Sequence, residues 1–339
     1  MKKLLNSLYI TRQESYLHKE RDTLVIEHRR KKLLQLPAHS VGDIHCFGQV
    51  MVSPPLMGYC GEQGIGLSFF SEQGRFQARV QGRQSGNVLL RRQQYRESDR
   101  APEQIARMII AAKLANSRRV LLRHQRNHGE SAPVAGAAQH IAQLLKQVQH
   151  CDDMNRLRGL EGDAAARYFG VFAELIRPQV REQFPFSGRN RRPPQDAVNA
   201  LLSFLYSLLT QEISSALQGV GLDPYVGFLH VDRPGRVSLA LDVLEEFRAS
   251  WADRLALSLI NRQQVGADDF VTEASGAVRL KDEARKAVLT AYQSRKQEEI
   301  RHPFFNEKVS LGLLPHCQAL LLARHLRGDL ECYPPFSLR

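Results

Sequence analysis

Cysteine is scarce in this sequence, and no spacing groups the cysteines into a site. The cysteines are Cys46, Cys60, Cys151, Cys317 and Cys332. They include no C-x-x-C pair, and their odd number does not suit a framework of paired disulfides. Because a zinc knuckle or a disulfide scaffold requires such spacings, neither is indicated. We interpret the cysteines as small buried or unreactive thiols.

Long apolar runs are missing too. The longest, residues 200–209, covers about half of the ~20 residues that a membrane-spanning helix needs. Near the start of the chain, Arg12 and Glu14 interrupt any apolar core of a signal peptide. We therefore expect a soluble, cytoplasmic protein that does not associate with a membrane.

Acidic residues are in deficit. The sequence has 47 lysines and arginines against 35 aspartates and glutamates, which leaves a net charge of +12. The first 96 residues hold 15 basic and 7 acidic side chains, so this part of the chain carries most of the surplus. Such a surplus favours a phosphate-rich partner, so nucleic acid is the preferred interpretation, although a basic surface that only aids solubility stays an alternative.

The pattern of the chain changes near residue 96. Before it, short β-branched or aromatic segments alternate with turn residues, and one short helix is predicted after Ser53, with Pro54 and Pro55 in its first positions. After a polar link at residues 96–102, long segments have helical periodicity. We predict an α+β protein with a small antiparallel β domain at residues 1–96 and a larger all-α domain at residues 97–339.

A carboxylate interrupts the apolar face of one predicted helix. Glu161 shares a stripe of helical spacing with Tyr168, Phe169 and Phe172. An unpaired carboxylate on such a stripe would cost several kcal/mol, so a cation should meet it. The alternatives are an ion pair with Arg158 on the preceding turn, or a position at the rim of the packed face.

The segment GFLHVDRPGRVSLALDVLEEFRA, residues 227–249, holds an unusual amount of charge in an apolar frame. Asp242, Glu245 and Glu246 fall within about one turn of the predicted helix, where like charges repel. Their clustering calls for a cation, and a divalent metal ion would serve, with His230 folding back across the turn as a nitrogen ligand. The alternatives are a hydrogen-bonded core histidine and a solvated acidic surface.

The blocks that carry a resemblance to a known family are spread over nearly the whole chain. They are LNSLYITRQESYLHKERDTLVIE, the segment from LPAHSVGDIHCFGQV to NVLLRRQQYR, the GFLHVDRPGRVSLALDVLEEFR block, LINRQQVGADDF and HLRGDLECYPPF. In this order they resemble the CRISPR adaptation integrase family, the first of the Cas proteins, and most of all its type I-C branch. The resemblance implies a small β domain, used for dimerisation and as a DNA platform, followed by a helical catalytic domain.

The resemblance also implies roles for single residues. Glu161, His230 and Glu245 match the metal ligands of the family, and Asp242 matches an acidic position that supports the catalytic site. Since many relatives carry aspartate at the position of Glu245, direct coordination by Asp242 stays open. The basic positions that would meet DNA phosphates in relatives match Arg158, Arg233 and Arg248.

The reaction implied by the resemblance is the insertion of short DNA fragments, the spacers, into a CRISPR array. The 3′-hydroxyl of the fragment attacks a phosphodiester at the edge of a repeat, and water in its place gives endonuclease activity. A divalent ion can stabilise the charge that develops on the phosphate, and a mixed nitrogen and oxygen shell suits Mn²⁺ slightly more than Mg²⁺, which supply could still favour.

The implied partners are double-stranded DNA, from both spacer and repeat, and other protein subunits. The family works as homodimers bridged by a small ferredoxin-like protein, the second CRISPR adaptation protein. The competing hypothesis is a noncatalytic DNA-binding scaffold, in which the acidic cluster only closes salt bridges in a helical core.

Overall fold

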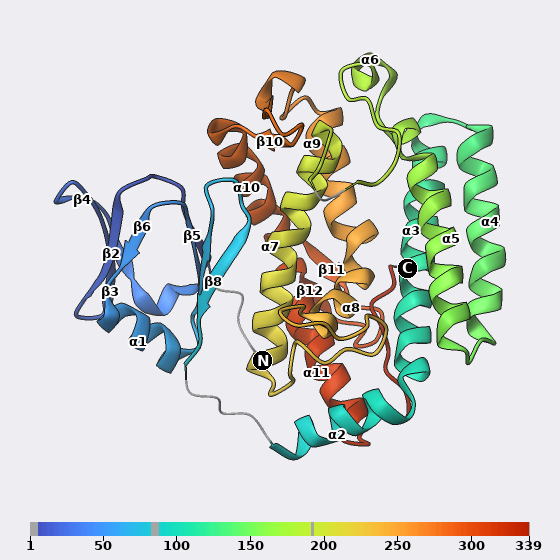
Figure 1. Ribbon diagram of the computed structural model, residues 1–339, viewed down its shortest axis with the longest axis horizontal. Coiled ribbons are helices and arrows are strands. Elements are labelled where there is room, and N and C mark those ends of the chain that lie inside the picture. The colour runs from blue at the N-terminus through green and yellow to red at the C-terminus, as the bar shows by residue number, and fades with distance from the viewer. Residues whose placement is uncertain (1–5, 83–87, 191–192, 339) are drawn as a thin grey trace.

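The computed structural model describes residues 6–82, 88–190 and 193–338. A strand-rich N-terminal part lies beside a larger helical part, as Figure 1 shows. The N-terminal strands and helix are β1 (Asn6–Ile10), β2 (Ser15–Glu20), β3 (Thr23–His28), β4 (Lys31–Pro37), β5 (Val41–Phe47), β6 (Val50–Val52), α1 (Pro54–Gln63), β7 (Gly66–Phe70) and β8 (Phe76–Val80).

The prediction of an antiparallel β domain is only partly right, because both four-stranded sheets are mixed. In the order β4-β3-β2-β6, the first three strands are antiparallel and β6 runs parallel to β2. In the order β1-β5-β7-β8, only the β7–β8 pair is antiparallel. Parallel neighbours require a long crossover, and helix α1 lies within the crossover that joins β5 to β7.

The predicted short helix is confirmed as α1. The Ser53 hydroxyl oxygen accepts a hydrogen bond from the backbone N–H of Leu56, and Pro54 and Pro55 occupy the first turn. Gly64 ends the helix with a φ of 68°, a left-handed conformation that glycine adopts without strain. Local sequence signals therefore determine both ends of this helix.

The helical part begins before the predicted boundary. Its helices are α2 (Val88–Arg100), α3 (Pro102–His128), α4 (Ala132–Gln149), α5 (Met154–Gly170), α6 (Pro178–Arg181), α7 (Ala197–Gly219), α8 (Ser238–Phe247), α9 (Arg254–Asn261), α10 (Asp282–Gln297) and α11 (Leu314–Leu326). Helix α2 thus runs through most of the predicted polar link. It is helical because residues 88–100 contain neither glycine nor proline, and because Leu90 and Gln94, one turn apart, are both buried.

The helical part is not all-α. Two antiparallel pairs of short strands interrupt it: β9 (Phe270–Thr272) with β10 (Val278–Leu280), and β11 (Glu299–Arg301) with β12 (Lys308–Ser310). Each of these strands has three residues, so they carry too little periodicity to be recognised in a helical sequence. Among the described residues, no helix is long and apolar enough to cross a membrane.

The core of the helical part surrounds α7 and α8. Every residue of α8 except Leu241 is buried, including the carboxylates of Asp242, Glu245 and Glu246. A π-helix, η3 (Arg248–Asp253), continues α8 directly into α9. A helix covered on all sides must find an internal partner for each of its charges, and these partners form the candidate site.

Candidate active site

A basic pocket of about 600 Å³ opens between α3, α5, α8 and the loop that precedes α8. Two carboxylates line it, Glu161 and Glu245, together with His230. Six basic side chains surround them: Lys113, Arg158, Arg189, Arg233, Arg236 and Arg248. The pocket therefore combines a small acidic centre with a cationic wall, which suits a phosphate-bearing substrate.

Asp242 holds the loop in place from the first turns of α8. Its side chain is fully buried and accepts hydrogen bonds from the backbone N–H groups of Phe228, Leu229 and His230 at 2.6 to 3.0 Å. Gly227 allows this approach, because a Cβ there would lie 2.7 Å from the Asp242 carboxylate. The segment between His230 and Asp242 is therefore a loop whose two ends are joined by these hydrogen bonds.

The same carboxylate orients the histidine. His230 Nδ1 lies 2.6 Å from Asp242 Oδ1, and a carboxylate only accepts, so Nδ1 carries the proton. The other nitrogen, Nε2, lies 3.8 Å from Glu245 Oε1. Asp242 is therefore saturated with donors and acts on the pocket through the orientation of His230.

Lys113, from the middle of α3, joins the two carboxylates. Its ammonium group contacts Glu161 directly and lies 2.7 Å from Glu245 Oε2. The expected cation for Glu161 is thus Lys113, and the alternative pair with Arg158 does not form, because the Arg158 guanidinium donates to the Leu229 carbonyl. The sequence signal for a buried cation was this lysine within the apolar run MIIAAKLA, and sequence reasoning missed it.

Glu245 is buried beside three groups that stabilise its ionised form. Burial alone would raise its pKa, but Arg248, Lys113 and His230 together lower the pKa of this carboxyl to about 2. Arg248 Nη2 lies 3.2 Å from Glu245 Oε1, and its guanidinium stacks over the Tyr206 ring at 4.8 Å. Glu245 therefore stays ionised inside the protein.

The predicted acidic patch on α8 divides into two. Glu246 lies next to Glu245 in sequence, but it faces away from the pocket and accepts hydrogen bonds from Tyr333, Gln318 and the backbone of Phe336. Burial raises the pKa of Glu246 to about 8 despite these donors. The prediction that one cation serves all three carboxylates of this helix is therefore wrong.

The three predicted metal ligands, Glu161, His230 and Glu245, line one pocket, and the Lys113 ammonium contacts the two carboxylates among them. Among the residues that the structure describes, no group of three histidine, cysteine, aspartate or glutamate side chains could hold a metal ion. The Lys113 ammonium lies between Glu161 and Glu245, where it supplies the positive charge. Glu245 Oε2 is buried and accepts no correctly oriented hydrogen bond from the described residues, in spite of the nearby ammonium.

The three arginines predicted to contact DNA all line the pocket, but they differ in exposure and in the partners that hold them. Arg233 is exposed in the loop before α8. Arg158 is held by the Leu229 carbonyl, and Arg248 is held by Glu245 and Tyr206. Sequence reasoning missed Arg189, which lines the same pocket and donates to Asn199 and Ser203 from a segment without helical or strand periodicity.

A second network supports the base of the pocket at the end of the π-helix. The Tyr206 and Tyr168 hydroxyls donate to the two oxygens of Asp253 at 2.5 and 3.1 Å. Burial raises the pKa of Asp253 to about 6, although both tyrosines and Arg248 oppose this shift. Tyr206 therefore connects the Asp253 carboxylate to the Arg248 guanidinium above its ring.

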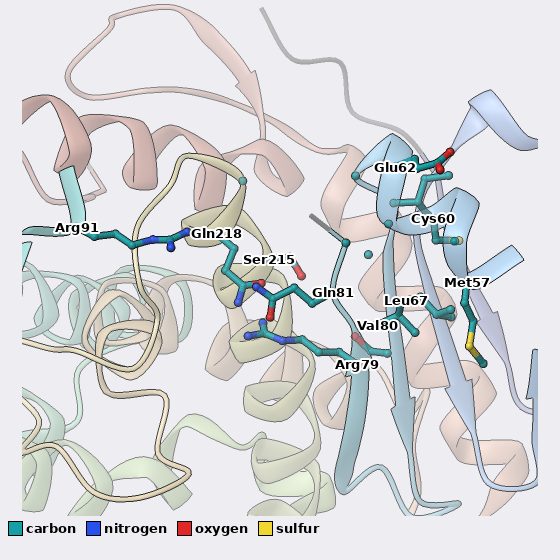
Figure 2. A pocket seen from close by; sticks show the side chains of 18 residues that line it. Met57, Cys60, Glu62, Leu67, Arg79, Val80, Gln81, Arg91, Ser215 and Gln218 are labelled. Carbon is teal, nitrogen blue, oxygen red and sulfur yellow. The ribbon is translucent and has the colours of Figure 1, made fainter. Parts of the chain in front are cut away.

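Another pocket, of about 700 Å³, lies where the strand-rich part meets the helical part. Figure 2 shows Arg79 and Gln81 of β8 and the segment after it facing Ser215 and Gln218 of α7. Many of its lining residues are glycines, and the side chains of the pocket include no histidine and one carboxylate, that of Glu62. The chemistry therefore favours the first pocket as the reactive centre.

Comparisons with known proteins agree with this choice. The family model described as "CRISPR associated protein Cas1" matches residues 8–294. A protein of Chlorobaculum tepidum named CRISPR-associated endonuclease Cas1 1 is 50% identical over 344 residues, covering all of both chains. A protein of Rhodospirillum rubrum named CRISPR-associated endonuclease Cas1 2 is 53% identical over 343 residues, covering 99% of both.

Solved structures give the same fold. A CAS1 protein from Thermotoga maritima superposes with a TM-score of 0.81 at 25% identity, over 96% of this chain and 97% of that one. A casposase bound to an integration product superposes with a TM-score of 0.83 at 21% identity, over 96% and 92% of the two chains. The mixed sheets and the helical part are thus a known arrangement.

Proposed function

The chain belongs to the Cas1 family of CRISPR-associated proteins, and we propose that its basic pocket catalyses both DNA cleavage and the joining of DNA fragments to a CRISPR array. The protein is an endonuclease and integrase. The observation that carries the assignment to this pocket is that Lys113 joins Glu161 to Glu245 while His230 Nε2 lies 3.8 Å from Glu245, inside a wall of arginines. A noncatalytic scaffold would not require a histidine oriented by a buried carboxylate.

The donor types of the pocket, two carboxylates and one imidazole, suit a divalent metal ion, which would replace the Lys113 ammonium as the partner of the carboxylates. Glu161, Glu245 and His230 Nε2 would hold it at the position where the Lys113 ammonium now balances the two carboxylates. Two oxygen donors and one nitrogen donor are compatible with either Mn²⁺ or Mg²⁺, with a small preference for Mn²⁺. When bound, such an ion supplies Lewis-acid stabilisation of charge on a phosphate and favours loss of a proton from an attacking hydroxyl.

The other residues of the pocket bind and orient the DNA. Arg233 and Arg236 lie on the loop before α8, where they can reach phosphate oxygens that enter the pocket. Arg248 holds Glu245, and Asp242 holds His230, so both act as positioning residues. The reacting 3′-hydroxyl and the scissile phosphate would therefore meet a rigid acidic centre inside a cationic rim.

A strand-transfer assay on a repeat-containing plasmid, with and without Mn²⁺ or Mg²⁺, tests this function. We expect Glu161→Gln and His230→Ala to lose transfer and cleavage by at least the 10- to 100-fold that is typical of changes around metal sites. Binding of DNA should persist, because the arginines of the pocket remain. Glu174→Gln is the matched control, since Glu174 pairs with Arg181 outside the pocket.

The proposal fails if both pocket variants, folded as shown by circular dichroism, transfer strands as the wild type does. Activity that persists in a metal chelator would contradict the metal in particular. Retained activity together with normal DNA binding would instead support the scaffold hypothesis.

The wider assembly remains a prediction. We propose a homodimer formed by the predicted N-terminal domain, residues 1–96, in whose strands Tyr16 and Met51 are paired across β2 and β6 with exposed fractions of 36% and 65%. Charge substitution at Met51 should then dissociate the dimer in sedimentation. A small ferredoxin-like second adaptation protein, the type I-C subtype and a cytoplasmic location are further proposals that follow from the sequence resemblance.

A further inference from the structure

A second basic pocket, of about 650 Å³, lies between α3, α9 and α10. Helices α9 and α10 are seen at the upper end of the helical part in Figure 1. This pocket shares no lining residue with the catalytic pocket. Four arginines line it against one carboxylate, that of Glu298: Arg123, Arg254, Arg262 and Arg295. Its charge therefore exceeds what the fold neutralises.

Arg254, the first residue of α9, shares its nearby carboxylate: Glu298 acts on it, but Glu298 already pairs with Arg295. Among the described residues, none accepts a hydrogen bond from its side chain or forms an ion pair with it within 4 Å. Burial lowers the pKa of Arg254 to about 10, and repulsion from Arg295 and Arg123 adds to this effect. The protein thus holds a half-buried guanidinium close to two others, which is unfavourable without an anion.

Arg295 also has a hydrogen-bond donor that no acceptor among the described residues satisfies. One of its terminal nitrogens donates to Glu298 Oε2 at 2.5 Å. Its Nε atom, however, is buried and has no hydrogen-bond partner among the described residues. A guanidinium presents its donors as a planar fork that matches two oxygens of a phosphate, so an incoming anion would satisfy both the charge and the free donor.

We propose that the pocket formed by Arg123, Arg254, Arg262 and Arg295 binds a backbone phosphate of DNA, as an anchoring site separate from the catalytic pocket. The inference rests on the proposed function, which brings long DNA to this surface. Lys113 and Arg123 are ten residues apart on α3, about 15 Å along the helix axis. This distance corresponds to roughly four nucleotides of one strand, so DNA that reacts in one pocket is long enough to reach the other.

Fluorescence anisotropy of a labelled repeat duplex at several salt concentrations tests the anchoring site. Each phosphate contact that is lost lowers the slope of log affinity against log salt by about 0.9. Between 50 and 200 mM salt, one lost contact makes the fall in affinity about threefold smaller. We expect at least this change for Arg254→Gln and a larger one for Arg254→Gln combined with Arg295→Gln.

The matched control is Arg324→Gln, which removes the same charge from an exposed arginine on α11 outside the described pockets. Cleavage by Mn²⁺-loaded protein at saturating DNA should be unchanged in all three variants, because the catalytic pocket is intact. A second measurement uses the melting temperature. Inorganic phosphate, as a ligand of the pocket, should raise the melting temperature of the wild type more than that of Arg254→Gln.

Equal slopes for Arg254→Gln and Arg324→Gln would overturn the anchoring site while the catalytic proposal stands, and the pocket would then suit an acidic protein segment instead. A wild type that neither binds the duplex nor transfers strands would remove the catalytic proposal as well. The two failures are therefore distinct.

Discussion

At the scale of single residues, Asp242 and Glu245 differ in the hydrogen bonds that they accept, and this difference indicates which of them can bind a metal ion directly. Its two oxygens already accept three backbone N–H groups and the Nδ1 proton of His230. Glu245 Oε2, in contrast, has a cation nearby and no well-formed hydrogen bond from the described residues. We therefore propose Glu245 as the direct ligand and Asp242 as the residue that aims His230.

Substitution of Asp242 by asparagine should destabilise the protein and weaken metal binding. The amide can accept at only one atom, and each oxygen of Asp242 accepts two donors, so two donors lose their partner, at a cost of about 1–3 kcal/mol of unfolding free energy for each. Misorientation of His230 should lower the affinity for Mn²⁺ by about 10- to 100-fold. Urea unfolding and a Mn²⁺ titration of the melting temperature measure both effects.

Asp232→Asn is the control for this change, because Asp232 is exposed in the same loop. It should shift neither quantity measurably. Normal Mn²⁺ affinity in a folded Asp242→Asn protein would contradict the positioning role.

At the scale of elements, the π-helix η3 joins the end of α8, which lines the pocket, to the start of α9. Single wide turns of this kind are frequent at functional sites. Here η3 carries Arg248 at its start, against Glu245, and Asp253 at its end, against two tyrosines. The segment links the pocket to a carboxylate whose pKa is raised to about 6.

This carboxylate should make stability depend on pH. Unfolded Asp253 binds its proton near its ordinary pKa of 3.8, and the folded protein binds it near 6, so the folded state holds more protons between these values. Stability is therefore favoured at low pH and lost as the pH rises through about 6. Relative to Asp253→Asn, the wild type should lose about 2 kcal/mol of unfolding free energy between pH 4 and pH 7.

Urea unfolding of both proteins at several pH values between 4 and 7 measures this difference. Because other groups titrate equally in the two proteins, only the difference between their curves reports on Asp253. Parallel curves would show that Asp253 is ionised throughout the range.

At the scale of the whole molecule, a buried ion pair joins the strand-rich part to the helical part. Lys296 of α10 lies 2.7 Å from Glu212 of α7 and donates to the Ser7 hydroxyl of β1 at 2.9 Å. Both charged side chains are almost fully buried, with exposed fractions of 3% and 6%. Burial raises the pKa of Glu212, and Lys296 opposes this shift.

Lys296→Met should therefore destabilise the protein by about 3–5 kcal/mol, since it leaves the Glu212 carboxylate buried without its cation. Lys308→Met, which removes an exposed lysine 3.8 Å from Glu299, should cost less than about 1 kcal/mol. Thermal unfolding measures both. If the double change Lys296→Met with Glu212→Leu is no more stable than Lys296→Met alone, the unpaired charge is not the cause.

Several features could be predicted from the order of residues alone because their signals are local. Ser53, the prolines after it and Gly64 determine both ends of α1 within a dozen positions. The alternation of short segments predicts the strands, and the spacing of His230 and Asp242 predicts a loop closed by one short turn. These depend on backbone preferences and on contacts between near neighbours, which a sequence displays directly.

Tertiary packing decided the rest, because the contacts join residues far apart in the chain. Lys113 meets Glu161 across 48 positions, and Glu246 meets Tyr333 across 87, so neither partner could be read from spacing. Strand direction likewise depends on a crossover and not on local pattern. Helix α8 is buried on every side, and a buried charge takes whichever partner the neighbouring elements bring to it.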